Sequence, residues 1–183
     1  MCQKNHEKLI YSESTGGQWF YQPMKLISGN QITTIPKLSK TWSVRLEYQP
    51  EDKPHTDWAN IFHNTIGENM GAPGTRIPAI FTKPNDHQLS VFSYVNGDTN
   101  YRVDLLRKPM PHEWYSLVVE QKFVDSKYIF SISVNGNEVH NIENNTPEIF
   151  YNVKTWVSNP FIVAAPGLVQ KLHISTGQCK FLV

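Results

Sequence analysis

The chain has 183 residues, of which 39% are hydrophobic and 18% are charged. This composition is too apolar and too weakly charged for a disordered polypeptide, and the length suits one domain better than two. The formal net charge of +1 leaves no extended positive field to attract nucleic acid or an anionic membrane surface. No run approaches the roughly 20 apolar residues of a membrane helix, and residues 1–8 lack the apolar region of a signal peptide. We therefore expect a globular domain without nucleic-acid binding and without membrane insertion.

Alternating apolar and polar residues predict a series of half-buried β-strands. The alternation is clear over residues 42–48, 88–95, 114–121 and 128–134. Segments rich in Pro, Gly, Asn and Asp separate these runs, and Asn135-Gly136 is the strongest hairpin signal among them. Several strands in sequence with this spacing favour an all-β antiparallel sandwich or barrel.

Helical structure has little support. Twelve prolines are spread along the chain, and no stretch of helical length combines a capping residue with a helical period. A short helical turn fits only at residues 146–150, where Thr146 can cap and Pro147 suits the first turn. We expect little or no helix.

The chain divides into a polar leader, residues 1–19, and a single domain over residues 20–183. The leader can pair with the C-terminal strand, because many sandwiches bring their first and last strands side by side. Cys2 and Cys179 lie at opposite ends of the chain, which excludes a disulfide-dense miniprotein and a four-cysteine zinc site. They either form one disulfide, worth about 4–5 kcal/mol in the loop-entropy model, or remain unrelated thiols.

Two neighbouring segments carry a resemblance to a known family. In residues 112–120 a tryptophan, Trp114, opens a strand, and residues 128–139 hold a strand that ends in Asn135-Gly136. Together they resemble the central hairpin of laminin-G-like domains, which belong to the concanavalin A-like lectin/glucanase superfamily. Residues 167–174 are similar to the last strand of those domains. Upstream, residues 58–63, 76–81 and 88–91 follow the order of the strands that precede the hairpin, so the likeness covers roughly residues 40–176.

This resemblance implies a jelly-roll sandwich of two curved sheets, whose concave face or rim loops bind glycans or protein partners in many relatives. It also implies an extracellular or cell-surface setting, although residues 1–8 are no signal peptide. The expected function is that of a non-catalytic recognition module, lectin-like or adhesive. A structural or self-assembling matrix domain is a further alternative, which would show a flat apolar patch and no groove.

Catalysis is the main alternative, because the superfamily also contains glycosidases. The glucanase relatives carry Glu-x-Asp-x-Glu on one strand, and this chain contains no such run. Glu113 and Glu120 are an odd number of residues apart, so they point to opposite faces of a strand. A divergent hydrolase or lyase would need an acid pair from different strands, for example Glu47 with Glu113 or Asp104. Two carboxylates about 5–10 Å apart on the concave face would favour it.

The candidate ligand-binding residues are Trp58, Asn60, His63 and Arg76. Trp42 and Trp114 are expected in the core, whereas Trp58 is the best candidate for an exposed tryptophan that contacts a sugar or a protein. Arg76 ends a long glycine-rich loop, and such loops are disproportionately functional. Its guanidinium would pin the loop to backbone carbonyls or reach a ligand carboxylate or hydroxyls. His63 is more often a satisfied face residue than a ligand.

Calcium is a possible cofactor, because many relatives hold one at a rim with Asp and Asn oxygens. The candidates are Asp98 and Asn100 on one loop and Asp57 on another. Turn loops are also rich in Asp and Asn for conformational reasons alone.

Overall fold

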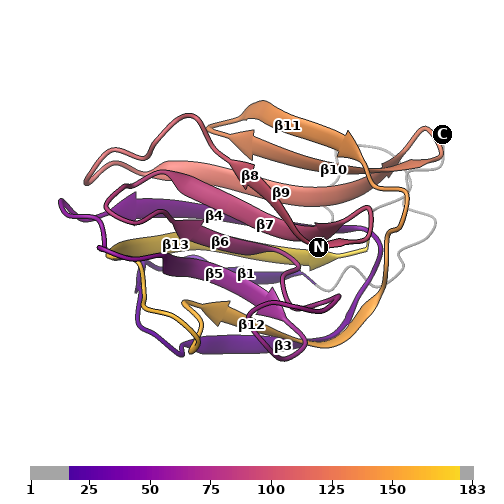
Figure 1. The fold of residues 1–183 in the computed structure, drawn as a ribbon, viewed down its shortest axis with the longest axis horizontal. Helices are drawn as coiled ribbons and strands as arrows, with labels where there is room; N and C mark the ends of the chain where they lie inside the picture. Colours follow the sequence, from indigo (N-terminus) through magenta and orange to yellow (C-terminus); the bar gives the residue numbers. More distant parts are fainter. Residues whose placement is uncertain (1–16, 178–183) are drawn as a thin grey trace.

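Two antiparallel β-sheets pack face to face in the computed structural model, which describes residues 17–177 (Figure 1). One sheet has seven strands in the order β1-β13-β4-β9-β10-β11, with β2 also paired to β13. Its strands are β1 (Gln18–Phe20), β2 (Met24–Lys25), β4 (Trp42–Pro50), β9 (Tyr115–Val124), β10 (Lys127–Val134), β11 (Asn137–Glu143) and β13 (Gly167–Thr176). This sheet lies behind the other one in Figure 1.

The second sheet has six strands in the order β3-β12-β5-β6-β7-β8. Its strands are β3 (Gln31–Leu38), β5 (Ala59–Thr65), β6 (Ala79–Thr82), β7 (Leu89–Val95), β8 (Asp98–Asp104) and β12 (Phe150–Val157). Residues 17–177 contain no helix, and so this part of the chain has no helix that could cross a membrane. The predicted all-β, antiparallel jelly-roll sandwich is confirmed.

The strands occur where alternation predicted them. Residues 42–48 fall in β4, 128–134 fall in β10, and all of residues 114–121 except Trp114 fall in β9. Asn135 (φ 48°) and Gly136 (φ 83°) both have positive φ and join β10 to β11, as the Asn-Gly signal indicated.

The helical turn considered at residues 146–150 is wrong. Residues 144–149 form an irregular connection from β11, at the edge of one sheet, to β12 in the other, and this loop curves along the right of Figure 1. A helix rises only about 1.5 Å per residue, whereas an extended chain covers more than 3 Å, and this crossing needs the longer reach.

Alternate strand residues from both sheets fill the space between them. In β4 the inward side chains are Val44, Leu46 and Tyr48, each at most 2% exposed, so Arg45 and Glu47 point outward. Trp42 is buried as expected, but Trp114 is only partly buried because it lies just before β9 begins. Packing in the core therefore fixes which side chains of each strand point inward and which lie on the outer face of the sheet.

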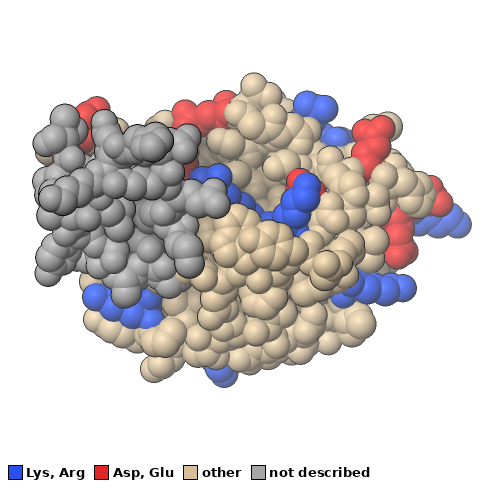
Figure 2. All heavy atoms as spheres, turned by 180° about the vertical axis from the view of Figure 1, so that it is seen from behind, with Lys and Arg blue, Asp and Glu red and all other residues tan. Residues whose placement is uncertain are grey.

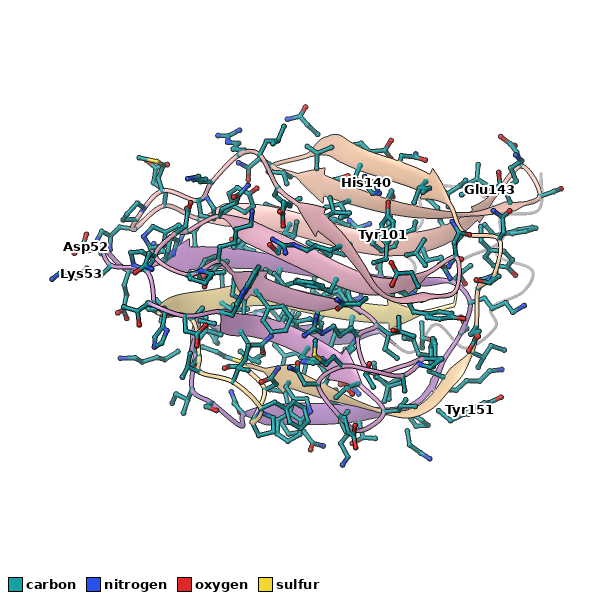
Figure 3. All side chains as sticks on the ribbon, viewed as in Figure 1. Asp52, Lys53, Tyr101, His140, Glu143 and Tyr151 are labelled. Carbon is teal, nitrogen blue, oxygen red and sulfur yellow. The ribbon has the colours of Figure 1, made fainter. Side chains whose placement is uncertain are left out.

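One edge of the sandwich is closed by a contact between the two sheets. Tyr101 of β8 and His140 of β11 point toward each other (Figure 3), and the Tyr101 hydroxyl lies 3.1 Å from His140 Nε2. Phe130 packs edge-on against the Tyr101 ring. Burial lowers the pKa of His140, which keeps the imidazole neutral at this edge.

At the opposite edge, the end of the leader joins the sheet. Gln18 and Trp19 of β1 lie opposite Ile174 and His173 of β13, and the Trp19 ring stacks on His173 at 3.8 Å between centroids. Cys2 and Cys179, for which a disulfide and two unrelated thiols were the alternatives, lie outside the described residues.

Candidate functional site

A pocket of about 570 Å³ lies on the outer face of the six-stranded sheet. Its floor is formed by Phe81 of β6 and Phe92 of β7, whose rings meet edge to face at 5.4 Å. Both point away from the core because their strand neighbours Ile80 and Val91 point into it. The full lining is Asp57, Trp58, Asn69, Met70, Arg76, Phe81, Phe92, Asn100, Arg102, Phe161, Ile162 and Val163.

Arg76 enters this pocket from the end of the glycine-rich loop between β5 and β6. Its guanidinium carbon lies 4.5 Å from the Phe92 ring centroid and 5.0 Å from that of Phe81. Nε donates to the Asn69 carbonyl oxygen at 2.9 Å, and Nη1 donates to Asn100 Oδ1 at 2.5 Å. Arg76 therefore pins its loop to a backbone carbonyl oxygen, which is one of the two sequence interpretations, and it also lines the pocket. That it reaches a ligand stays a prediction.

The loop that carries Arg76 is closed by Gly74. Gly74 has φ +85°, and its carbonyl oxygen accepts a hydrogen bond from Ile66 N at 3.0 Å. A Cβ there would come within 2.9 Å of side-chain carbons of Ile66 and Phe150. Only glycine allows both this backbone conformation and this close packing, so the loop geometry that places Arg76 depends on it.

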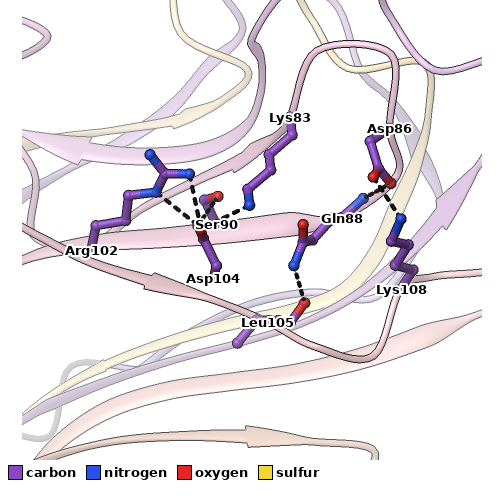
Figure 4. Close-up of polar contacts among 8 residues, drawn as sticks. All are labelled: Lys83, Asp86, Gln88, Ser90, Arg102, Asp104, Leu105 and Lys108. Carbon is purple, nitrogen blue, oxygen red and sulfur yellow. Dashed lines mark hydrogen bonds and ion pairs between the residues drawn. The ribbon is translucent and has the colours of Figure 1, made fainter.

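A second cation, Arg102, faces the pocket from β8. Its guanidinium carbon lies 4.8 Å from the Trp58 ring centroid, and Nε pairs with Asp104 Oδ1 at 2.7 Å. Lys83 and Ser90 converge on the same carboxylate (Figure 4), at 2.8 and 2.6 Å. Partial burial opposes ionisation of Asp104, but these hydrogen bonds outweigh it and lower its pKa to about 2. Asp104 is therefore a fixed anion that neutralises Arg102.

The far wall of the pocket is a loop, residues 158–166, held in place by Asn159. Asn159 Oδ1 accepts hydrogen bonds from the backbone N–H groups of Phe161 and Ile162, at 3.0 and 3.1 Å. Its Nδ2 lies 2.6 Å from His63 Nδ1, and its own N–H donates to Asn60 Oδ1 at 2.7 Å. Asn159 thus ties the apolar wall to β5.

His63 is a neutral support beneath the pocket. Its side chain is fully buried, and Nε2 lies 2.6 Å from the Thr75 carbonyl oxygen. A carbonyl only accepts, so Nε2 carries the proton and Nδ1 accepts from Asn159 Nδ2. Burial lowers the pKa of His63 to about 4, and the nearby charge of Arg76 acts in the same direction.

The four predicted ligand-binding residues divide into two layers. Trp58 and Arg76 line the pocket. Asn60 and His63 are completely buried below it, and their polar atoms are used within the protein. Strand alternation in the sequence does not show that the loop of residues 158–166 covers these two side chains.

The three predicted calcium ligands do not fit one shared metal site. Asp57 precedes β5, whereas Asp98 begins β8 opposite Val95, at the other end of the sheet. Asn100 Oδ1 faces the guanidinium of Arg76, which disfavours a cation beside it. Within residues 17–177, no group of three or more His, Cys, Asp or Glu side chains is placed to hold a metal.

One of the two carboxylate pairs considered for catalysis, Glu47 with Asp104, is divided between the two sheets. Glu47 points outward from the seven-stranded sheet and accepts hydrogen bonds from Gln170 and Lys171. Asp104 lies on the outer face of the other sheet, so the core separates the two. Glu113 is exposed in the turn before β9.

Several pocket residues were missed in the sequence, namely Phe81, Phe92, Arg102 and the wall residues Phe161 and Ile162. The aromatic floor looked like core, since strand patterns do not reveal which apolar face meets the other sheet. One signal was available. An apolar run within residues 159–166, a proline-bounded loop, indicates a loop that packs on something.

The fold, with this pocket on it, is similar to that of solved proteins at low sequence identity. One is a heptameric SAP-like pentraxin from Limulus polyphemus (TM-score 0.57, 14% identity, 88% of this chain and 77% of that chain). Another is domain 4 of an extracellular arabinanase from Geobacillus stearothermophilus in complex with arabinotriose (TM-score 0.52, 19% identity, 88% and 85%). A third is an endo-β-1,4-glucuronan lyase from Trichoderma reesei (TM-score 0.50, 13% identity, 93% and 84%).

No protein-family model matches the sequence, and no curated protein matches it. The likeness is therefore one of fold, and the neighbours include both binding proteins and enzymes. The chain therefore shares the jelly-roll sandwich fold of these three proteins.

Proposed function

We propose that the protein binds a glycan in the pocket on the outer face of the six-stranded sheet, without catalysing a reaction on it. The observation that carries this proposal is the pocket itself. Its volume of about 570 Å³ lies within the range typical of small-molecule sites. It combines an aromatic floor with hydrogen-bonding side chains, which suits a ligand with apolar ring faces and polar edges.

The neighbouring structures support a saccharide as the ligand. Domain 4 of the arabinanase, which shares this fold, was solved with arabinotriose. A pocket with polar and aromatic walls also argues against the self-assembling alternative, which calls for a flat apolar patch. The laminin-G-like subgroup, the extracellular setting and an adhesive role stay predictions.

The lining supports binding rather than catalysis. Asp57 is the one carboxylate among the lining residues that the structure describes. A glycosidase needs two carboxyl groups, one of them protonated, to flank the scissile bond. Asp104 is held ionised by its cations, and His63 is buried with both nitrogens engaged. Neither can exchange a proton with a sugar in the pocket.

Calorimetric titration with a panel of neutral and acidic oligosaccharides tests this proposal. We expect at least one member to bind, without chemical change during long incubation. Trp58→Ala should weaken binding tenfold or more, because it removes an aromatic wall of the pocket. Trp19→Ala is the matched control, since Trp19 is a 47% exposed tryptophan at the edge of the other sheet. A chelator should leave the affinity unchanged.

The proposal fails if no saccharide binds, or if Trp58→Ala and Trp19→Ala bind equally well. Chromatography of the incubated sugars would reveal shortened or unsaturated products. Their release would contradict the proposal that the protein binds the glycan without catalysing a reaction on it.

A further inference from the structure

Arg76 is a buried cation without a counter-ion. The residue is 6% exposed, and among residues 17–177 no carboxylate lies within ion-pairing distance of it. Its hydrogen-bond partners are neutral, namely the carbonyl oxygen and Oδ1 of Asn69 and Oδ1 of Asn100. Burial lowers the pKa of Arg76 to about 10, so it still carries its charge at neutral pH. A buried charge without an ionic partner is costly in the absence of a ligand.

The neighbouring cation shows that this arrangement is particular to Arg76. Arg102 shares the pocket, but both Nε and Nη2 pair with the carboxylate of Asp104, at 2.7 and 3.0 Å. Arg45 and Arg107 also lack an ion pair within the described part of the chain, yet both are exposed, so water solvates their charge. Among the cations of residues 17–177, Arg76 alone combines burial, an uncompensated charge and a place in a pocket wall.

The free donors of Arg76 fit a planar anion. A guanidinium has five N–H groups, with two on each terminal nitrogen. Nη1 uses one of its two on Asn100, and Nη2 uses one on Asn69 at 3.4 Å. One N–H on each terminal nitrogen has no acceptor within the described residues. These two free N–H groups can donate to the oxygens of a carboxylate, the anion with which arginine pairs most readily.

The rest of the lining strengthens this preference. The charged lining residues are Arg76, Arg102 and Asp57, and Arg102 is neutralised by Asp104 outside the lining. Lys83, paired with the same Asp104, adds a further positive charge at the edge. Asp57 Oδ1 accepts a hydrogen bond from the backbone N–H of Trp58 at 2.7 Å. Asp57 also lies at the opposite end of the sheet from the start of β8, the strand whose Asn100 contacts Arg76. The charge beside the floor is therefore positive.

We infer that the pocket selects an acidic glycan, whose sugar carboxylate pairs with the guanidinium of Arg76. This inference rests on the proposed function, because it names the class of glycan for the same pocket. The aromatic floor holds the guanidinium in position through the rings of Phe81 and Phe92, and the ligand supplies the missing negative charge.

Three oligosaccharides of equal length test it by calorimetry, namely a uronate oligomer, the same oligomer with its carboxylates reduced to alcohols, and a sulfated neutral oligomer. The native protein should bind the uronate at least tenfold more tightly than the reduced oligomer. It should also bind the uronate more tightly than the sulfated one, whose tetrahedral group fits the planar fork less well. Added salt should weaken uronate binding and leave binding of the reduced oligomer unchanged.

Arg76→Gln should abolish the preference, so that the uronate and the reduced oligomer bind within twofold of each other. Arg45→Gln is the matched control, since it removes an exposed charge from the other sheet. If Arg76→Gln unfolds, the ligand comparison on the native protein still decides. Equal affinity for the uronate and reduced oligomers overturns the inference and leaves glycan binding intact. Equal affinity for the uronate and sulfated oligomers overturns the assignment to a carboxylate, and no binding of any oligomer overturns both proposals.

Discussion

The outer faces of the two sheets are built from the same strand alternation, yet they treat charge differently. On the seven-stranded sheet several charged side chains pair with one another. Lys171 lies 2.9 Å from Glu47 Oε1, and Lys122 lies within 4 Å of Glu120 and Glu138. Figure 2 views this face and shows acidic and basic side chains interspersed around a hollow. These charges pair with one another or, as at Arg45, are exposed to water.

On the six-stranded sheet, loops rise over the face and change what the same kind of strand position can do. Phe81 and Phe92 would be exposed on a bare sheet, but the loops on either side leave them 2% and 6% exposed. The guanidinium of Arg76 is enclosed with them and keeps no ionic partner among the described residues. A covering loop therefore turns an outward strand face into a pocket wall, because it removes water from polar and charged groups on that face.

The largest expected effect comes from releasing the covering loop. Asn159→Ala removes the acceptor for Phe161 N and Ile162 N and the donor to His63 Nδ1. Each buried group left without a partner costs about 1–3 kcal/mol, so the free energy of unfolding should fall by about 3 kcal/mol or more. Urea unfolding measures this change, and glycan affinity should fall with it.

Asn159→Asp is the informative control for that variant. It keeps the oxygen that accepts from Phe161 and Ile162, but it places an oxygen opposite the lone pair of His63 Nδ1. In Asn159→Asp the loop of residues 158–166 should stay in place, but the pKa of His63 should be higher than in the native protein. An Asn159→Ala protein as stable as the native one would show that the loop is held by its apolar contacts instead.

The next effect is a pH dependence centred on His63. The imidazole has a pKa of about 4 in the folded protein and about 6.5 when unfolded, so the unfolded chain binds the proton more readily. Stability is therefore complete above about pH 6.5 and decreases as the pH falls toward 4, by up to about 3 kcal/mol. Asp104, with its pKa of about 2, acts only at lower pH.

Urea unfolding at several pH values between 4 and 7 measures this slope. His173, whose pKa burial also lowers to about 4, acts in the same range at the edge of the other sheet. His63→Gln should remove about half of the slope, because His173 has a pKa in the same range. A slope as steep in His63→Gln as in the native protein would assign the whole effect to His173.

The smallest effect is expected on the face whose charges are paired. Lys171→Ala breaks an exposed ion pair with Glu47, and such pairs contribute about 0–1 kcal/mol. Thermal unfolding should show little change, and glycan affinity should equal that of the native protein. A loss of affinity in this variant would move the binding site to the seven-stranded sheet.

Much of the fold was predictable because its cause is local. The strands around Trp42, Leu89, Tyr115 and Phe130 follow from a period of two, and the turn at Asn135-Gly136 follows from the positive φ that only a few residues tolerate. The turn considered at residues 146–150 failed because the distance between two sheets, a non-local quantity, decided it.

The candidate site was only half predictable. Trp58 and Arg76 were identified because a tryptophan beside polar residues and an arginine after a glycine-rich loop are locally unusual. Phe92 was not, because an apolar residue in a strand reads the same whether it meets the core or a pocket. Asn100 was assigned to calcium from its loop, but the fold brings it against Arg76 from another strand.

The sequence by itself determined the all-β class, the positions of the main strands and hairpins, and the absence of a charge field suited to nucleic acid. Those properties depend on backbone geometry and composition, which act between near neighbours along the chain. Only the tertiary structure decided that Arg76, Asn100 and Asn159 meet around one sheet face, with His63 sealed beneath it. That meeting depends on strand order across the sheet and on where two distant loops come to rest. Burial then makes the unpaired charge of Arg76 matter, since a charge needs a partner only once water has been removed.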